Sequence, residues 1–539
     1  MAKRWGSVSR MTAPCLLAVG LLGSLAEPAG SMEEYRAING SGNSYLKPER
    51  GAAGTHLMRL AGHAYADLVS QPAGPGRPSA REISNEAAQQ TRVALNHARG
   101  TDFVWLWGQF LDHDIDLSPE MSPKEPFPIE VPAGDPHFDP AGTGTQVIGL
   151  NRTVYDTATG HARNNPRRQK NMITSWIDAS NVYGSSRSRA DALRRHGGDG
   201  LLKISAGDLL PFNTDGLANA GGPGPSLFLA GDVRANEQAG LTAMHTLWVR
   251  EHNRVAAEIR ARKPRLSGDE IYERARAWVG GLMQSITYNE FLPVLLGRHG
   301  IPEYRGWDAE VDGSVAQEFS TAAYRFGHSM VSPLLLRLDA SGAPIAAGHL
   351  TLAAAFFAPH EISAHGIDSI LRGVAAQQAS EVDLMVIDEL RNFLFGPPGA
   401  GGLDLVSLNI QRGRDHGLES FNRTRALFGL RPYREFYEIT SDEDLAERLE
   451  RLSGDVDDID LWVGGLAEDH VDGALLGPTF YTIVSDQFIR LRDGDRFYYE
   501  RMYRGRELRE MKRTTLADVI RRNTAIGHEL PDDVFRLSR

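Results

Sequence analysis

One segment constrains the fold more than any other: residues 105–117, which read Trp-Leu-Trp-Gly-Gln-Phe-Leu-Asp-His-Asp-Ile-Asp-Leu. On a helix, this spacing places four polar side chains along one side, among bulky apolar neighbours: Gln109, Asp112, His113 and Asp116. Burying such groups costs free energy unless partners satisfy them. The segment therefore predicts a helix that points polar side chains at a cofactor or a metal rather than at solvent.

Helical periodicity dominates most of the remaining chain. Apolar residues at helical spacing predict a helix that begins near Leu241 and others near 101–117, 269–292, 315–331, 380–394, 442–453 and 514–523. Clusters of Pro and Gly predict little regular structure from Met32 to about Gln90 and a long ordered loop over 118–144. The sequence contains no βαβ alternation, Gly-rich phosphate motif or internal repeat. We expect a mainly α protein with one large domain and little β structure.

Composition excludes several classes of protein. Hydrophobic residues make up 41% and charged residues 24%, which is typical of a soluble globular chain. The net charge is −11, and no run of Lys and Arg is long enough to follow a nucleic acid. We therefore expect no nucleic-acid partner.

The N-terminus predicts export. A basic leader precedes an apolar stretch from Ala13 to Ala26 that is too short to span a bilayer and ends in small residues. We expect a signal peptide over residues 1–26, one domain over 27–539, no stable membrane span, and a secreted or periplasmic protein. A disordered basic leader or an uncleaved anchor is the alternative. The only cysteine, Cys15, lies in this stretch, so the processed chain would form no disulfide.

By itself a His-Asp pair is more often structural than catalytic, and the wider motif decides. Residues 107–116, Trp-Gly-Gln-Phe-Leu-Asp-His-Asp-Ile-Asp, closely resemble the distal helix of the animal-type haem peroxidases, in particular the lactoperoxidase and peroxidasin branch. The resemblance assigns His113 to proton transfer, Gln109 to the distal hydrogen-bond network, Asp112 to an ester with haem and Asp114 to calcium. A neutral imidazole above the iron can move a proton between the two oxygens of hydrogen peroxide.

A second motif, Gly-Asp-Val-Arg-Ala-Asn-Glu-Gln at 231–238, resembles the family's other distal segment. The resemblance gives Arg234 the role of stabilising charge on the leaving hydroxide, and a guanidinium suits that role. Glu237 matches the second carboxylate that forms an ester with haem. Gln238 stands where some members carry a sulfonium-forming Met, so we expect iodide, thiocyanate and bromide to be preferred over chloride.

Two further motifs resemble the proximal side of the family. In residues 324–333, Tyr-Arg-Phe-Gly-His-Ser-Met-Val-Ser-Pro, the resemblance makes His328 the iron ligand and Arg325 a partner of a haem propionate. In residues 408–417 it makes Asn409 the acceptor for the N–H of the proximal imidazole, a weaker acceptor than a carboxylate. Arg412 suits either a propionate or a structural salt bridge.

Oxygen-bearing side chains alternate with other residues in Thr-Ser-Trp-Ile-Asp-Ala-Ser at 174–180. Side chains of Thr174, Asp178 and Ser180, with the carbonyl of Trp176, present the oxygen ligands that calcium prefers. Alone, the pattern equally suits a strand edge or a turn capped by Asp or Ser. The family resemblance favours calcium and adds Asp114 as a further ligand.

The sequence therefore predicts an enzyme that contains haem b and calcium. The resemblance implies that it reduces hydrogen peroxide and oxidises small anionic or aromatic donors through a ferryl intermediate. Two alternatives remain. A related fatty-acid dioxygenase would carry a tyrosine three residues before the proximal histidine, but that position holds Arg325, and Tyr324 lies about 100° further round a helix. A catalytically idle adhesion protein would not need the whole set of haem-site residues, and the chain has no Arg-Gly-Asp tripeptide. The sequence leaves the oligomeric state open.

Overall fold

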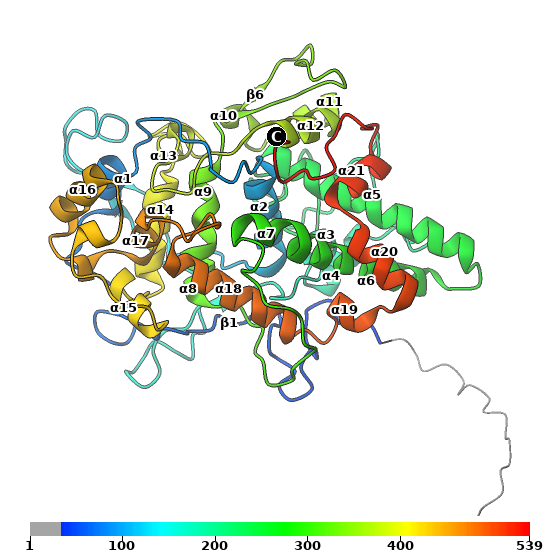
Figure 1. Cartoon of the computed structure of the whole chain (residues 1–539), viewed down its shortest axis with the longest axis horizontal. Helices are drawn as coiled ribbons and strands as arrows, with labels where there is room; N and C mark the ends of the chain where they lie inside the picture. Colours follow the sequence, from blue (N-terminus) through cyan, green and yellow to red (C-terminus); the bar gives the residue numbers. More distant parts are fainter. Residues whose placement is uncertain (1–33, 539) are drawn as a thin grey trace, which may run out of the picture. The chain divides into compact units, whose positions relative to one another are not determined.

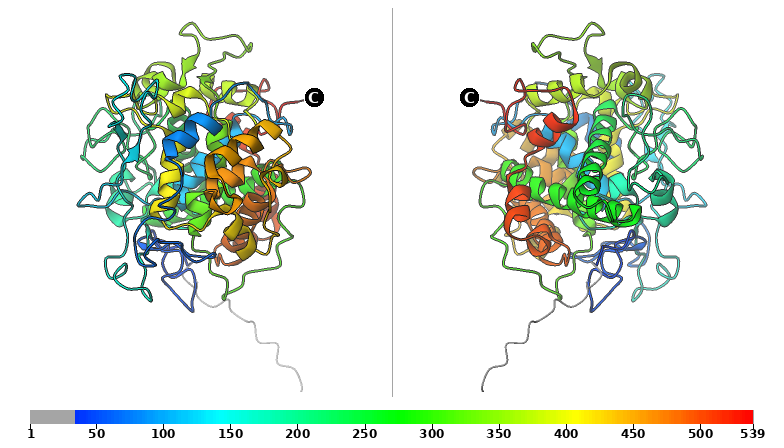
Figure 2. Two further views of the ribbon diagram at one scale, coloured as in Figure 1. Left: turned by 90° about the vertical axis from the view of Figure 1, so that its left-hand side faces the viewer. Right: turned by 90° about the vertical axis from the view of Figure 1, so that its right-hand side faces the viewer.

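The helix predicted over residues 101–117 forms as α2 (Phe103–Ile115) and lies in the interior of the folded chain, surrounded by other helices (Figure 1, Figure 2). A computed structural model describes residues 34–538, whose helices and strands all belong to one unit that begins at Arg36. The proposed signal peptide and Cys15 lie outside the described residues. Among the described residues, no helix has both the length and the hydrophobicity needed to cross a bilayer.

The expectation of a mainly helical protein with a single large domain is confirmed. The described helices up to residue 295 are α1 (Ala80–Ala87), α2, α3 (Ser180–Tyr183), α4 (Arg187–Leu193), α5 (Ala239–Arg262), α6 (Gly268–Ile286), the π-helix η1 (Thr287–Phe291) and α7 (Leu292–Leu295). Next come α8 (Gln317–Thr321), the 3₁₀ helix η2 (Ala323–Phe326), α9 (Gly327–Met330), α10 (Leu352–Ala355), α11 (Pro359–His365), α12 (Asp368–Ala376) and α13 (Asp388–Arg391). The last are α14 (Leu405–Asp415), α15 (Phe421–Leu427), η3 (Phe436–Glu438), α16 (Glu443–Ser453), η4 (Val456–Asp458), α17 (Leu461–Ala467), α18 (Pro478–Asp493), α19 (Tyr499–Met502), α20 (Gly505–Arg513) and α21 (Leu516–Asn523).

The β structure of the described residues is limited to three antiparallel ribbons of two strands each. β1 (Thr55–His56) pairs with β4 (Lys170–Asn171), β2 (Ile129–Glu130) with β3 (Val147–Ile148), and β5 (Leu334–Leu335) with β6 (Leu350–Thr351). Each strand has only two residues, so these ribbons pin loops and form no layer of the core.

Aromatic side chains hold the central helices together. Trp107 and Phe110 of α2 contact Trp248 of α5, and all three are fully buried. Burial of each such side chain stabilises the fold by about 1.5–3 kcal/mol. α6 lies beside α5 (Figure 1), and its start is fixed by a capping box in which Ser267 and Glu270 bond to each other's backbone N–H groups. The core thus fixes α2 against α5, which in turn packs on α6.

Two predicted helices are wrong in part. The segment 380–394 is helical only in α13, and the residues before it form a bend at 382–384 between isolated bridges from Ser380 to Leu95 and from Val386 to Gln89. The segment 315–331 breaks into α8, η2 and α9, because Ala322 leaves the helical region with φ −133° and ψ −68°. The region 32–90, expected to have little regular structure, contains α1 and β1.

Candidate active site: two histidines on neighbouring helices

His113 lies in the last turn of α2, which ends when Asp116 turns to an extended conformation. Only 2% of the side chain of His113 is exposed. Its Nδ1 atom lies 3.6 Å from Oδ1 of Asp232, a residue of the loop before α5. Burial and the nearby Arg234 hold the pKa of His113 well below its usual value, although Asp232 acts in the opposite direction. The imidazole is therefore neutral at neutral pH.

Arg234 lies in a ring of oxygen acceptors on the same side of α2. Its Nε donates to Oδ1 of Asp232 (2.9 Å), its Nη1 to Oδ2 of Asp112 (3.1 Å) and its Nη2 to the carbonyl of Asp116 (2.7 Å). Burial opposes the charge of Arg234, but Asp232 and Asp112 outweigh it and raise the pKa. The guanidinium is thus permanently charged and fixed in direction.

Asp232 lies between His113 and Arg234 and contacts both. Burial favours its protonation, but Arg234 and then His113 hold the pKa of this carboxyl well below its usual value. The loop reaches this position because Gly231 approaches the backbone of α3 so closely that a Cβ atom there would lie 2.4 Å from the carbonyl oxygen of Ser180. The amide of Asp232 then donates to the carbonyl of Asn181 (3.0 Å). Sequence reasoning identified this motif but missed the role of Asp232, whose contact with His113 exists only in three dimensions.

The other distal residues predicted from sequence also gather here. Gln238 caps α5 by accepting from the amide of Gly240 (2.6 Å), and its Nε2 donates to Oε1 of Gln109 (3.2 Å). Burial raises the pKa of Asp112 to about 7 and that of Glu237 to about 7, against the opposing charge of Arg234. Each of these two carboxyls therefore carries a proton much of the time at neutral pH.

His328 lies on α9, the last of the three short helices that replace the single predicted one. Burial and then Arg325 lower the pKa of His328 to about 3, so this imidazole is also neutral. Asn409 on α14 places Nδ2 2.8 Å from Nδ1 of His328, while its Oδ1 accepts from Nη1 of Arg325 (3.0 Å). The sequence expectation pairs the amide oxygen with the imidazole, whereas here the nitrogen faces it because Arg325 occupies the oxygen.

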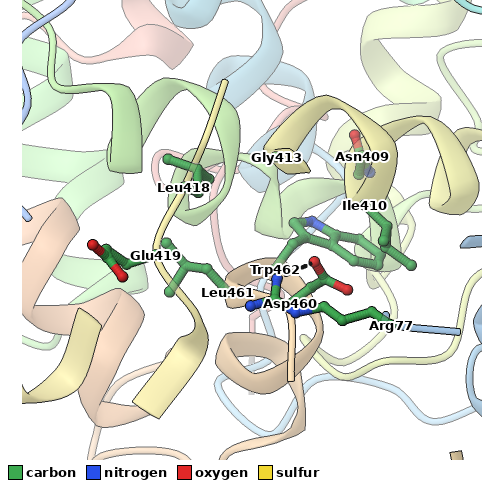
Figure 3. A pocket seen from close by; sticks show the side chains of 9 residues that line it. All are labelled: Arg77, Asn409, Ile410, Gly413, Leu418, Glu419, Asp460, Leu461 and Trp462. Carbon is green, nitrogen blue, oxygen red and sulfur yellow. Dashed lines mark hydrogen bonds and ion pairs between the residues drawn. The ribbon is translucent and has the colours of Figure 1, made fainter. Parts of the chain in front are cut away.

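A small cavity of about 10 Å³ lies beside Asn409, between α14 and α17 (Figure 3). It is bordered by Trp462, whose indole N–H donates to the carbonyl of Arg325 (3.4 Å), and by the ion pair of Arg77 with Asp460 (2.8 Å). The cavity holds about one water molecule. These contacts stiffen the support of Asn409 and Arg325.

Arg412, which the sequence assigns either to a haem propionate or to a structural salt bridge, contacts protein groups through Nη1. Its Nη1 donates to the carbonyl of Asn151 (2.8 Å) and to Oγ1 of Thr153 (2.7 Å), and lies 3.3 Å from Asp415. His416 likewise bonds Thr153 (3.0 Å). These residues brace α14.

The group around His113 and the group around His328 lie close together because α2 packs on both α5 and α9. Charge couples them as well, since both Arg234 and Arg325 lower the pKa of Asp112 against its burial. Asp112 keeps 29% of its side chain exposed and Arg234 keeps 15%, although both lie deep enough for burial to be the largest influence on their pKa values. Both side chains are therefore partly reached by solvent.

The predicted calcium ligands also come together. The amides of Asp178 and Ala179 donate to Oδ2 of Asp114 (3.1 Å each), and the hydroxyl of Thr174 donates to Oδ1 of Asp178 (3.0 Å). The hydroxyl of Ser180 donates to the carbonyl of Asp114 (2.7 Å). The loop between β4 and α3 is thus fixed to the residue next to His113.

Two of these ligands are buried acids. Burial and then the charge of Asp178 raise the pKa of Asp114 well above its usual value, and burial raises the pKa of Asp178. Among the described residues, Oδ2 of Asp178 has no hydrogen-bond partner, and Nε of Arg36 lies 3.9 Å from it. Trp176, the predicted carbonyl ligand, is a buried residue of the same loop. Two buried carboxyls with an unpaired oxygen fit a hard cation.

Comparison with known proteins identifies the family of the chain. Residues 35–535 match the sequence model of the animal haem peroxidase family, so the chain belongs to that family. Such a protein is a haem peroxidase enzyme, and the family implies a haem group.

Individual relatives cover most of the chain. It is 38% identical over 520 residues to Peroxinectin A of Dictyostelium discoideum, covering 94% of this chain and 96% of the relative. It is 37% identical over 556 residues to human Eosinophil peroxidase, covering 94% of this chain and 77% of the relative. With Drosophila melanogaster Peroxidasin the identity is 37% over 540 residues, which cover 90% of this chain but only 35% of the relative.

Solved structures give the same fold. Peroxidase A from Dictyostelium discoideum matches with a TM-score of 0.86 at 35% identity, covering 94% of this chain and 100% of that one. The fatty acid alpha-dioxygenase of Arabidopsis thaliana matches with a TM-score of 0.77 at 20% identity, covering 94% and 84%. The second likeness shows a shared fold alone.

Proposed function

We propose that this haem peroxidase reduces hydrogen peroxide and oxidises small donors such as iodide, thiocyanate, bromide or phenols. The observation that carries the proposal is the linked set of His113, Asp232 and Arg234, in which one carboxylate lies beside a neutral imidazole and a fixed guanidinium. A peroxidase needs these two groups on the same side: one to accept a proton from peroxide, the other to stabilise the departing oxygen.

The residues of the proximal side fit haem b. His328 would bind the iron through Nε2, and haem would supply the redox-active metal. A metal-bound imidazole carries its proton on Nδ1 and needs an acceptor there. Asn409 meets this need when its amide oxygen, rather than its nitrogen, faces His328. Arg325 then loses that oxygen as its partner and becomes available for a propionate carboxylate.

On the distal side the protein moves the proton. His113 is neutral and can accept a proton at its free nitrogen, and Asp232 stabilises the imidazolium that results. Arg234 cannot give up its proton and offers only charge and N–H donors. Gln109, held by Gln238, completes the hydrogen-bonding surface of this side.

Asp112 and Glu237 are proposed to form ester bonds with haem. Their pKa values of about 7 mean that burial already disfavours their charged forms, and esterification removes that charge altogether. Extraction with acidified organic solvent separates the cases: haem that stays with the protein is ester-linked, and extractable haem is not.

Asp114, Thr174, Trp176, Asp178 and Ser180 are proposed to bind calcium. The ion would neutralise two buried carboxyls and tie the loop to α2 beside His113. Calcium should raise the melting temperature of the wild-type protein but not that of Asp178→Asn. An equal rise in both would contradict the site.

Export to the periplasm or the extracellular space remains a proposal from the N-terminal segment alone. The preference for iodide, thiocyanate and bromide over chloride rests on Gln238, which here forms a hydrogen bond instead of a sulfonium link.

Purified full-length protein supplied with haem and calcium tests the main proposal. We expect one haem per chain by absorption and peroxide-dependent oxidation of iodide. Oxygen uptake with a fatty acid and no peroxide requirement would favour the dioxygenase alternative instead. Failure to retain any haem would favour an idle adhesion protein.

A further inference from the structure

Away from the haem-site residues, three segments that are distant in sequence bring together two histidines and a glutamate. His97 lies in the loop before α2, Glu381 in the extended segment after α12, and His470 after α17. One ligand atom from each lies within 4.8 Å of the other two. This cluster is independent of the proposed haem and calcium sites, whose residues it does not share.

The carboxylate of Glu381 is held in place by backbone donors. The amide of His97 donates to Oε2 (3.0 Å) and the amide of Val382 to Oε1 (3.1 Å). The segment that carries Glu381 is also hydrogen-bonded to the segment before His97, because the amide of Glu381 donates to the carbonyl of Ala94 (2.8 Å). A carboxylate fixed in this way needs little reordering to bind an ion.

The two imidazoles present their Nδ1 atoms to that carboxylate. Nδ1 of His97 lies 3.0 Å from Oε2, and Nδ1 of His470 lies 3.9 Å from Oε1. Nε2 of His470 lies 2.6 Å from the carbonyl of Val382, which can only accept, so Nε2 carries the proton and Nδ1 keeps its lone pair. A histidine whose other nitrogen donates to a backbone carbonyl is the usual form of a metal ligand.

We propose that His97, Glu381 and His470 bind a divalent transition metal, with zinc as the preferred ion. Zinc binds nitrogen and carboxylate oxygen at about 2.0–2.2 Å, so tetrahedral ligands lie roughly 3.4 Å apart. The two imidazoles face different oxygens of this one carboxylate, at 3.0 Å from Oε2 and 3.9 Å from Oε1, and these separations lie on either side of that value. Two nitrogens disfavour calcium and magnesium, which take oxygen ligands.

Exposure leaves a way in for the ion. The side chain of His97 is 49% exposed, whereas those of Glu381 and His470 are each 18% exposed. Three protein ligands with one open, solvent-facing position leave room for a water as the fourth ligand.

The site would act as a cross-link. Ser380, next to Glu381, donates its amide to the carbonyl of Met330, two residues beyond His328 (3.1 Å). The loop that carries His97 leads directly into α2. Zinc would therefore tie together the segments that support both histidines of the haem site, and it should stabilise the fold without taking part in the reaction.

Calorimetric titration of the full-length haem protein with Zn²⁺ tests the proposal. The protein is first stripped with 1,10-phenanthroline in a buffer that contains calcium throughout, so that oxygen sites stay filled. We expect one zinc per chain, and a rise in melting temperature on the order of 2–4 °C at 100-fold excess over the dissociation constant.

Substitutions of the three proposed ligands test where the zinc ion binds. His470→Ala and Glu381→Gln should weaken zinc binding by more than about 10-fold. His97→Ala is a second route if Glu381→Gln fails to fold, since His97 lies half exposed. The matched control is His365→Ala, because His365 also lies near a glutamate, 3.8 Å from Glu361, but its cluster does not bring three ligands together. The control should bind zinc like the wild type. No binding by the wild type, undiminished binding by His470→Ala, or loss of binding in His365→Ala would each overturn the proposal.

Discussion

The two sides of the proposed haem site each hold a buried histidine, but beside a different kind of partner. His113 faces a carboxylate, with Nδ1 3.6 Å from Asp232, and His328 faces an amide, with Nδ1 2.8 Å from Asn409. Both imidazoles are neutral, because burial lowers the pKa of each. They differ in how readily each can hold an added proton.

The charge of the neighbouring side chain determines how readily each histidine holds an added proton. Two unit charges 4 Å apart attract by about 4 kcal/mol at an effective dielectric constant of 20. Asp232 therefore stabilises a protonated His113, although burial and Arg234 keep the resting group neutral. His328 has no such anion among the influences on its pKa, and Arg325 acts against its protonation. One histidine is suited to accept protons and the other to remain a neutral ligand.

Removing the ligand should have the largest effect. His328→Ala should abolish stable haem binding, because no other side chain of the proximal helix replaces its nitrogen. Absorption after gel filtration measures retained haem, and added imidazole should restore part of it. An unchanged spectrum in the variant without imidazole would assign the ligand elsewhere.

Removing the proton acceptor, His113, should have the next largest effect. His113→Ala should keep haem but slow the reaction with peroxide by about 10²–10⁴-fold, the usual contribution of a positioned acid or base. Stopped-flow absorption gives the rate, and His360→Ala, which changes an exposed histidine (77% of its side chain), is the control. A rate equal to that of the control would remove His113 from the mechanism.

Asp232→Asn tests the comparison directly, because it gives His113 an amide neighbour like the one beside His328. Outer partners of this kind contribute about 10–100-fold, and we expect a loss of peroxide reactivity in that range. Asp232 raises the pKa of His113, so its loss lowers that pKa further. Reactivity needs neutral His113 and falls as pH drops through its pKa, so the acid limb of the rate profile should move to lower pH.

Asp112→Asn is the matched comparison for that profile. It removes the other carboxyl group beside Arg234, 3.1 Å away, together with any ester that this group forms with haem, but not the neighbour of His113. The acid limb should move less than in Asp232→Asn. Equal movement in both would mean that the acid limb does not depend on the contact between Asp232 and His113.

Sequence reasoning found α2, α5 and the proximal motif because their residues lie close together in the chain. It placed a helix over 380–394 because it counted apolar residues at helical spacing. The buried residues Val382, Leu384 and Val386 instead follow a period of two, which indicates extended chain. That signal was present in the sequence.

Other features had no local signal. The break at Ala322, where the backbone leaves the helical region, separates one predicted helix into three short ones. The approach of Asp232 to His113 and the turned amide of Asn409 depend on residues more than 80 positions apart along the chain. Motifs fix which residues are present, whereas tertiary contacts fix which atoms face each other.

The reverse exchange makes the proximal side resemble the distal one. Asn409→Asp should lower the reduction potential of the iron, because a carboxylate draws the Nδ1 proton more strongly and raises the electron density on the ligand. Spectroelectrochemistry measures the shift, with Asn289→Asp, whose amide bonds Ser285 and Tyr499 elsewhere, as the control. An unchanged potential would show that Asn409 does not bond the ligand.

The smallest effect is expected at the link that holds Gln109. Gln238→Ala removes both the cap of α5 and the bond to Gln109, and the lost cap should lower the free energy of unfolding by about 0.5–2 kcal/mol. Peroxide reactivity should change little, since His113, Asp232 and Arg234 keep their contacts. Denaturant melts and stopped-flow rates on the same sample separate stability from reactivity. A fall in rate as large as that of Asp232→Asn would place Gln238 within the proton-transfer machinery, and the distal side would then depend on an amide as the proximal side does.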